Sequence, residues 1–524
     1  ANTLARHIAA SDPKIRSVFE QWKGTDALKS PLEKNEEMKA VMLEETPWLR
    51  EAVSESAARR NIGLLFDEAR LIEESACTLK RLAEARISDG SWPWFPGGNR
   101  NDFITFYIVA GFGRLRQLGV PAEMGLAVSA LPRLDAWLTD EHKAILHRGS
   151  KESNHLTPTV AFALYARSFF LKDRAVGKAD RDAVDYFLAQ SKQYWPAAGR
   201  QSQAHLAWAL KRWGDEITPA AILKSVREFA TVDDELGMFW RDAERSWRWE
   251  RAPVETQALL IEALQEVAGD TGAVESCKVW LLKQKQTQGW KTTKATADAI
   301  YALLLRGNQL LGSDARVEVA LAGKVIKPEQ VEVGTGFYEK RLGPAEILPE
   351  MGNVTVTKRD DGVAWGALHW QYLEDLSNVK PYEGTPLSVR KRLFIKEHTA
   401  RGPVLNPAAG VVPQGAELVT RLELRVDRDM EYVHLKDSRA SCAEPVNVLS
   451  RYVWQDGLGY YESMRDTSAH FFIDFLPAGV YVFEYSCRLQ QKGVFRSGMS
   501  EIQCLYAPEF NSHSESMLLR VGQE

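Results

Sequence analysis

The sequence predicts a multidomain α+β protein in which an α/α toroid of helical hairpins is followed by a small β unit and an antiparallel β-sandwich. Two observations support this fold class. Apolar residues recur at helical spacing up to about residue 311, and from Val317 onward they alternate with polar residues as in β-strands. One pattern of small and large apolar residues also returns several times within the helical part. A chain of 524 residues has room for two to four domains.

The repeated pattern is clearest in residues 289–304, where Gly289 and Trp290 predict a turn and the following threonines suit the cap of a helix. Its copies lie roughly 40 to 55 residues apart, which is typical of helix pairs that cannot bury their apolar faces alone. No copy resembles a polar terminal cap, so we expect the pairs to close into a ring; an open helical array is the alternative. Alanines at fixed positions would let neighbouring helices approach closely: Ala204 and Ala209, Ala258 and Ala263, Ala297 and Ala302.

The N-terminal part is predicted to be helical. Residues 1–50 form a polar, helix-favouring segment in which Ser30 suits the cap of a helix that begins at Pro31. The toroid is predicted over residues 51–312, and an amphipathic helical region from Glu51 to Leu82 precedes its repeats.

Two β regions follow the toroid. Residues 313–376 contain strand candidates at Val317–Leu321, Val354–Thr357 and Ala364–Tyr372, too few for an independent sandwich, so we expect partner strands from elsewhere. Residues 377–524 predict an antiparallel β-sandwich. Its strand candidates are Leu387–Lys396, Glu417–Val426, Val446–Trp454, Ala469–Asp474, Val480–Leu489 and Met517–Val521.

Composition excludes several classes of protein. The net charge of −4 arises from 66 basic and 70 acidic residues that are well mixed, which is unlike a nucleic-acid binder. No apolar run approaches the roughly 18 to 20 residues that span a bilayer. The chain begins with Ala and lacks a basic-then-apolar leader, so we expect it to be processed or excised.

Neither a metal site nor a cofactor is predicted. The five cysteines include no Cys-x-x-Cys pair, and the ten histidines are scattered without a His-Glu-x-x-His motif. Cys487 and Cys504 lie on two predicted strands and could face each other; two buried free thiols are the expected outcome.

The candidate binding surface lies at one end of the toroid. Aromatic side chains there could form a binding floor, although tryptophans packed inside the ring are the simpler interpretation. The surface comprises Trp92, Trp94, Asp102, Trp249, Glu255 and Trp290.

An enzymatic function is the other alternative. Glycosidases, polysaccharide lyases and terpene cyclases also have α/α toroids, so the alternative is an enzyme that acts on a glycan or a terpenoid. General acid–base catalysis would need two carboxyl groups with separated pKa values across a cleft. The acidic residues have ordinary explanations, since Asp102 suits a helix cap and Glu255 a helix start. We therefore expect no catalytic residue among the candidates Asp102, Asp233, Asp234, Asp242, Glu255 and Asp298.

Several long motifs resemble one family. Residues 458–462, 471–474 and 476–485 are similar to the C-terminal domain of bacterial α2-macroglobulins, and so is the stretch 506–510. Residues 45–48, 92–98 and 254–258 are similar to the thioester-domain region of that family. The resemblance implies an α/α toroid, a CUB-like unit at residues 313–376 and a C-terminal macroglobulin domain. It also implies that strands preceding the toroid complete the CUB-like unit.

The resemblance implies a protease inhibitor of the periplasm or bacterial cell surface. Such proteins trap proteases by a collapse that follows cleavage of a bait segment, so proteases and upstream macroglobulin domains are the expected partners. Many members carry a Cys-x-Glu-Gln thioester motif. Cys77 and Cys277 lack the glutamine, and Cys487-Arg488-Leu489-Gln490 lacks the glutamate. We therefore expect no thioester and no covalent capture.

Overall fold

The computed structural model divides the chain into two compact units. Unit 1 comprises residues 1–27, 60–283 and 290–364, and unit 2 comprises residues 28–59, 284–289 and 365–524. The division into four parts made from the sequence stays a prediction. The structure describes residues 3–4, 7, 13–22, 25–34, 48–61, 68–244, 253–290, 292–305, 317–327, 330–331, 337–359, 364 and 366–522.

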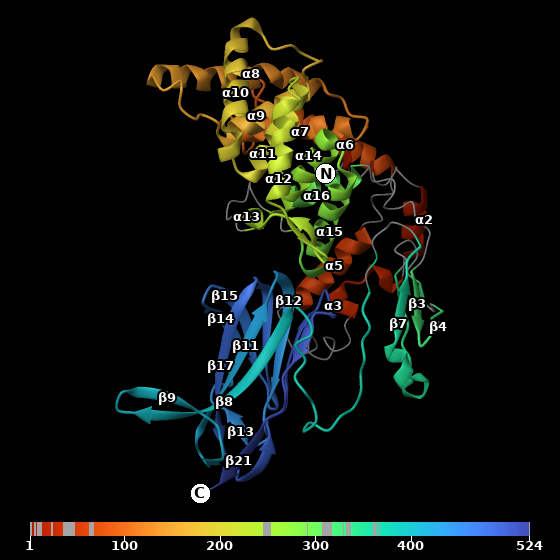
Figure 1. The fold of residues 1–524 in the computed structure, drawn as a ribbon, viewed down its shortest axis with the longest axis vertical. Coiled ribbons are helices and arrows are strands. Elements are labelled where there is room, and N and C mark those ends of the chain that lie inside the picture. The colour runs from red at the N-terminus through yellow and green to blue at the C-terminus, as the bar shows by residue number, and fades with distance from the viewer. Residues whose placement is uncertain are drawn as a thin grey trace. The chain divides into compact units, whose positions relative to one another are not determined.

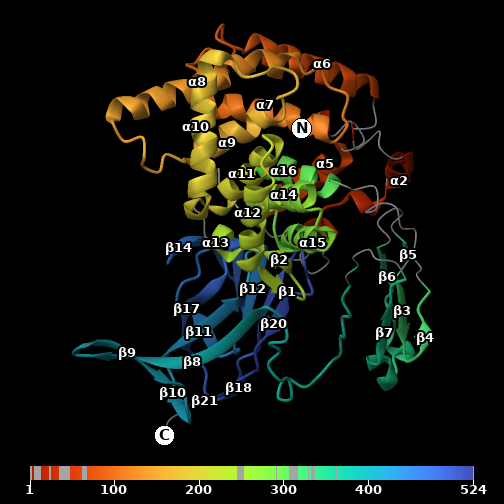
Figure 2. The same ribbon diagram turned by 45° about the horizontal axis from the view of Figure 1, so that its top comes forward.

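Most of unit 1 is an α/α toroid, as predicted (Figures 1 and 2). Five inner helices contact one another in chain order, and α8, α10 and α12 pack outside them. The inner helices are α7 (Asp102–Gln117), α9 (Pro158–Ser168), α11 (Arg200–Arg212), α14 (Pro253–Ala263) and α16 (Thr293–Leu304). The other helices of the toroid are α6 (Glu68–Glu84), α8 (Gly125–Arg148), α10 (Lys178–Tyr194), α12 (Ile217–Glu228) and α15 (Thr271–Thr287), whose last turn belongs to unit 2.

Shorter elements connect these helices. A π-helical turn, η5 (Leu264–Ala268), extends α14, and η3 (Trp195–Ala197) follows α10. The hairpin β1 (Thr231–Asp233) and β2 (Gly237–Phe239) precedes α13 (Arg241–Glu244), and α2 (Pro13–Trp22) lies at the N-terminal end of the chain.

Small residues allow the inner helices to pack closely. Ala204, Ala209, Ala263 and Ala302 are completely buried, and Ala258 is almost completely buried. A methyl group occupies little volume, so two helix backbones can approach each other at these positions. The alanine spacing in the sequence therefore marks the helix contacts of the ring.

Two helix caps predicted in the toroid can be compared with the structure. A threonine after Trp290 does cap α16, because the Thr292 side chain accepts a hydrogen bond from the Ala295 amide at 3.0 Å. Thr157 caps α9 in the same way by accepting from the Val160 amide at 3.2 Å, although this cap was not predicted. The prediction that Asp102 caps α7 is wrong, because the side chain of Asn101 accepts the bond from the Ile104 amide at 2.9 Å. Asp102 is instead the first residue of α7, where its charge suits the helix dipole.

Unit 1 also contains the small β unit. Its three-stranded sheet has the order β4 (Lys324–Val325), β3 (Glu318–Leu321), β7 (Val354–Thr357), and β5 (Gln330–Val331) pairs with β6 (Tyr338–Glu339). The 3₁₀ turns η7 (Pro344–Glu346) and η8 (Pro349–Gly352) precede β7. The predicted strand at Ala364–Tyr372 is wrong for residues 366–372, which pair with no described strand and leave the side chains of Leu368, Trp370 and Tyr372 exposed.

The C-terminal part of unit 2 is the predicted antiparallel sandwich, with one apolar core between its sheets. A three-stranded sheet, β10-β21-β18, lies beside two larger ones. The five-stranded sheet has the order β13 (Ala443–Pro445), β17 (Gly479–Leu489), β11 (Glu417–Val426), β8 (Leu387–Thr399), β9 (Gly402–Pro407). The six-stranded sheet has the order β14 (Arg451–Gln455), β15 (Leu458–Met464), β16 (Ser468–Leu476), β12 (Met430–Ser438), β19 (Ser500–Cys504), β20 (Asn511–His513). The remaining strands are β10 (Val411–Pro413), β18 (Gly493–Arg496) and β21 (Leu518–Gly522).

Unit 2 also contains a segment from the N-terminal part of the chain. The turn η1 (Asp26–Leu28) leads to α3 (Pro31–Lys34), and α5 (Leu49–Asn61) follows further along. The predicted cap of α3 is confirmed, because the Ser30 hydroxyl accepts a hydrogen bond from the Glu33 amide at 3.1 Å.

Candidate functional site

The structure places the six residues of the predicted toroid-end surface in different surroundings. Trp92 is buried, and its indole donates to the Leu82 carbonyl at 2.7 Å, so packing explains it. Trp94 is 46% exposed on the loop before α7. Asp102 accepts from the Arg133 guanidinium at 3.3 Å. Trp290 is half-buried, Glu255 is buried, and Trp249 lies outside the described residues. The binding surface stays a prediction.

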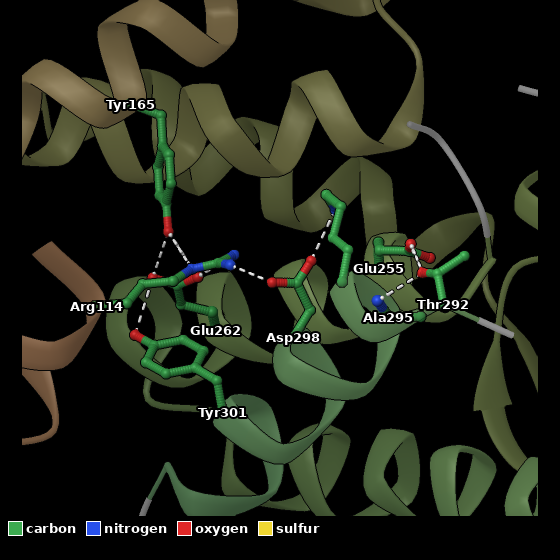
Figure 3. Close-up of polar contacts among 9 residues, drawn as sticks. Arg114, Tyr165, Glu255, Glu262, Thr292, Ala295, Asp298 and Tyr301 are labelled. Atoms are coloured by element: carbon green, nitrogen blue, oxygen red, sulfur yellow. Dashed lines mark hydrogen bonds and ion pairs between the residues drawn. The ribbon is translucent and has the colours of Figure 1, made fainter. Parts of the chain in front are cut away.

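A buried cluster of charged and phenolic side chains lies where the first and last inner helices of the ring meet (Figure 3). Arg114 projects from α7 and donates to the Asp298 carboxylate on α16 at 2.7 Å. The same guanidinium donates to Glu262 on α14 at 3.2 Å. It also donates to the Tyr165 hydroxyl on α9 at 3.0 Å. One arginine therefore connects four of the five inner helices.

Two tyrosines complete the coordination of the Glu262 carboxylate. Tyr165 donates to its oxygens at 2.8 Å, and Tyr301 donates to Oε1 at 3.2 Å from the opposite side in Figure 3. The carboxylate is completely buried, and an ion in such a place needs paired charge and hydrogen bonds to remain ionised. Arg114 and the two phenols supply both.

Lys294 adds a second cation to the cluster. Its ammonium donates to Asp298 at 2.8 Å and lies 5.6 Å from the centre of the Tyr107 ring. Asp298 therefore accepts from Arg114 through one oxygen and from Lys294 through the other.

The cluster shifts the pKa values of its members in directions that follow from burial and neighbouring charge. Burial raises the pKa values of Tyr165 and Tyr301 well above their ordinary value, and Glu262 adds to the effect. Burial opposes the charge on Arg114, but the surrounding phenols and carboxylates outweigh it and raise its pKa. Burial and the charges of Arg114 and Lys294 lower the pKa of His205 well below its ordinary value. The phenols and the imidazole are therefore neutral at pH 7.

Glu255 is the one acid of the predicted surface whose burial is nearly complete, at 2% exposed. Its Oε1 lies 3.5 Å from the Thr292 hydroxyl, and its Oε2 has no hydrogen-bond partner in the described part of the chain. Burial raises the pKa of this carboxyl group, although the Lys294 charge opposes the shift. Glu255 therefore differs from Asp298. Asp298 on α16 accepts hydrogen bonds from two cations, whereas Glu255 on α14 accepts none from a cation in the described part of the chain.

The cluster is better suited to stabilising the fold than to transferring protons. General acid–base catalysis needs groups that can change protonation state beside a substrate, and the carboxylates of Glu262 and Asp298 are fixed in ion pairs. Among the described residues no three His, Cys, Asp or Glu side chains are close enough to hold a metal ion. No helix in that part of the chain is long and apolar enough to cross a membrane.

The cysteines of the described residues are all free thiols, as predicted for Cys487 and Cys504. Burial raises the pKa of Cys487 to about 12 and that of Cys504 to about 11, so neither forms a thiolate at neutral pH. Cys487 is buried in the sandwich core, whereas Gln490 is exposed beyond the end of β17.

Asp298 is the only member of the buried cluster among the acidic candidates that the sequence provides. The pattern does contain a signal for Glu262, which is a charged residue within an apolar stretch of helix, whereas Arg114 stands with Arg116 in a basic last turn. A charge at a position that the helical period assigns to the core needs a partner of opposite charge. The partners themselves cannot be found this way, because they lie on other helices.

Comparison with protein-family models matches residues 387–509 to the bacterial alpha-2-macroglobulin MG10 domain. These residues cover most of the sandwich in unit 2. A search of curated proteins gives no match.

Solved structures of bacterial α2-macroglobulins are also similar to the chain at low identity. Trypsin-activated α2-macroglobulin from Escherichia coli is 12% identical over 90% of this chain and 30% of that chain, with a TM-score of 0.41. Salmonella α2-macroglobulin reacted with methylamine is 15% identical over 99% of this chain and 31% of that chain, with a TM-score of 0.33. The native Escherichia coli protein from domain MG7 to the C-terminus is 13% identical over 99% of this chain and 75% of that chain, with a TM-score of 0.31.

The chain thus spans less than a third of the first of these proteins. The identities and TM-scores are too low to support an argument, so the comparison rests on the family-model match of residues 387–509. That match confirms the resemblance found in the sequence motifs: this chain resembles the C-terminal part of a bacterial α2-macroglobulin.

Proposed function

We propose that the chain is the C-terminal portion of a protease inhibitor that traps proteases by conformational collapse after bait cleavage, without covalent capture. The single observation that supports this function is the match of residues 387–509 to the bacterial α2-macroglobulin MG10 domain. The proposal places the protein in the periplasm or at the cell surface. Its partners are proteases and upstream macroglobulin domains of the intact molecule.

The cysteines support the non-covalent part of the proposal. A thioester joins a cysteine sulfur to a glutamine side chain three positions later. Cys77 and Cys277 are followed at that distance by Lys80 and Trp280. At Cys487 the sulfur is buried in the sandwich while Gln490 is exposed, so the two groups do not meet.

The interior of the helical ring supports a mechanical role. Its centre is occupied by paired charges and buried aromatic side chains, with Arg114 joined to three neighbours at 2.7 to 3.2 Å. Such a packed interior transmits force as a rigid body, which a collapse that moves whole domains requires.

The test uses the polypeptide that carries this chain together with its upstream domains. After cleavage by trypsin it should retain the protease, so that trypsin still cleaves a small peptide substrate but not a large protein. Denaturing electrophoresis should show no covalent adduct. Prior treatment with methylamine should add no mass and should leave retention unchanged.

The Salmonella α2-macroglobulin, whose structure was solved after reaction with methylamine, is the matched control. Full cleavage of the large substrate would refute trapping. A methylamine adduct on a glutamine paired with a cysteine would refute the non-covalent mechanism.

A further inference from the structure

The described part of residues 28–59 forms a docked segment within unit 2, which we call the clasp (residues 28–34 and 48–59). It covers the outer face of the six-stranded sheet. Trp48 is 1% exposed, and Leu32 is completely buried with it against Phe472 and Leu505. Inside the clasp the Ser56 hydroxyl accepts from the Ser30 amide at 2.9 Å and donates to Glu33 at 2.6 Å. The clasp is therefore an ordered, hydrogen-bonded unit.

The sheet provides a specific socket for Trp48. The ladder between β12 and β16 pairs Glu431 with Phe475 and Val433 with Ile473, but it omits Tyr432 and Asp474. Tyr432 has a positive φ of 55°, which is unusual for a bulky residue. At this irregularity the Trp48 indole donates to the Asp474 carboxylate at 2.5 Å, and its ring packs edge-on against Tyr432 at 5.3 Å.

A pair of histidines lies beside this socket. Phe472 contacts Trp48 edge-on at 5.2 Å and is stacked with His434 at 4.9 Å. His434 Nε2 and His470 Nδ1 are 3.0 Å apart, and His470 Nε2 is 2.9 Å from the Ser468 hydroxyl. One ring must donate and the other accept, so the bond between them cannot survive when both rings are fully protonated.

The charged groups around the pair disfavour its protonation. Lys436 on β12 and the arginines Arg439 and Arg465 are the nearest cations. The nearby carboxylates are already engaged: Glu501 on β19 with Lys436, Asp474 on β16 with Trp48, and Glu55 on α5 with Tyr506 and Arg59. Glu33 of α3 is bonded to Ser56. The charges that act on the two rings are the positive ones of Lys436, Arg439 and Arg465, which oppose the formation of an imidazolium.

We propose that the clasp is an acid-released contact, in which the neutral His434–His470 pair holds the Trp48 socket closed and protonation of the pair opens it. The inference rests on the geometry of unit 2 and is independent of the proposed protease trap.

Linkage gives the direction of the effect. Burial, with the neighbouring cations, lowers the pKa of His434 to about 3 and that of His470 to about 4. In the released state both rings meet water and return toward the ordinary pKa of about 6.5. Above that pH both states are neutral and docking is complete. Between about pH 6.5 and 4 the released state takes up protons that the docked state does not, so docking weakens by up to about tenfold per pH unit for each histidine.

The first experiment follows Trp48 in the full chain labelled with 5-fluorotryptophan, with its fluorine resonance assigned by its loss in Trp48→Phe. The resonance should move to a solvent-exposed position as the pH falls from 7.5 to 4.5. In the double variant His434→Gln/His470→Gln it should keep the docked position throughout. His398→Gln, on an exposed residue of β8, should leave the wild-type profile unchanged. The signal of Trp240, buried in unit 1, reports whether the chain stays folded.

The second experiment measures the histidines themselves by carbon-13 labelling of their rings. In the wild-type chain both histidines should titrate together with the release of Trp48, below their ordinary pKa of about 6.5. In Trp48→Ala, which removes the indole packed on Phe472 and so the docked clasp, the pKa of each should rise by at least one unit. An unchanged Trp48 signal from pH 7.5 to 4.5 would overturn the proposal. So would a double variant that releases Trp48 at the wild-type pH, or histidine pKa values that do not respond to Trp48→Ala.

Discussion

At the scale of single residues, Arg114 links the first and last inner helices of the ring. Its guanidinium projects from α7 and donates hydrogen bonds to side chains on α9, α14 and α16. All three of these partners are buried. A buried ion pair adds little net stability when both partners are present, but removing one partner leaves the other charge without compensation. The arginine is therefore expected to be needed for the fold even though the pair itself contributes modestly.

Replacement of Arg114 tests this role. Arg114→Met keeps much of the apolar stem but leaves the buried Glu262 without its cation and Asp298 with Lys294 alone, so we expect a loss of about 3 to 5 kcal/mol in unfolding free energy. Urea denaturation of the full chain at pH 7.5 measures it.

The matched control is Arg181→Met, which removes an exposed i,i+4 pair with Asp185 on α10 and should cost less than about 1 kcal/mol. Equal losses in the two variants would contradict the assignment of a buried charge cluster.

Glu255 should make the stability of the chain fall as the pH rises, which is opposite to the pH dependence expected for docking of the clasp. Its folded pKa lies above the ordinary value, so the folded state favours the protonated form. Its contribution to stability is complete below the pKa of the unfolded chain, about 4.3, and is lost as the pH rises through the folded value. Glu255→Gln, which stays neutral, should therefore stabilise the chain more at pH 7.5 than at pH 4.5.

Thermal or urea unfolding of Glu255→Gln and wild type at the two pH values checks this. A stabilisation that is the same at both, or larger at pH 4.5, would show that burial does not raise the pKa of this carboxyl group.

At the scale of elements, contact between α14 and α16 depends on small residues. Ala302 is completely buried in a ring whose helices pack against each other on both sides. A larger side chain there must displace its neighbours, because a completely buried methyl group in a close-packed interior leaves no free space.

Ala302→Leu should therefore lower stability by about 1 to 3 kcal/mol through overpacking. Ala179→Leu, at an exposed position near the start of α10, should leave the unfolding midpoint nearly unchanged. An unchanged midpoint in Ala302→Leu would contradict close packing at this contact.

Local signals in the sequence predict most elements correctly, and failures occur where distant segments decide the outcome. The caps at Ser30 and at the threonines after Trp290 follow from neighbouring residues alone, and β11 has the predicted bounds. The stretch 366–372 alternates like a strand, but a strand also needs a partner, which no described segment supplies. The strand β12 was not among the candidates, because the irregularity at Tyr432 interrupts its alternation.

The same division applies to the candidate site. The sequence indicates Glu255 at a helix start and Asp298 as a further acidic candidate, and both side chains are buried. It did not identify Tyr165 or Tyr301, because a tyrosine in an apolar helix gives no sign that its hydroxyl meets a carboxylate from another helix. Trp48 was missed as a docking residue for the same reason, since its socket lies more than 380 positions later in the chain.

At the scale of the whole molecule, the pair between Arg114 and Asp298 has a consequence for how the protein is made. The two residues are 184 positions apart, and a ribosome that adds about 5 to 20 residues per second needs roughly 10 to 40 s to travel between them. Before Asp298 is made, Arg114 lacks its partner on the last inner helix, so the growing chain can hold at most an open arc of hairpins. Nascent chains arrested before residue 298 should therefore be cut readily by a protease, and they should become resistant once the last hairpin has emerged.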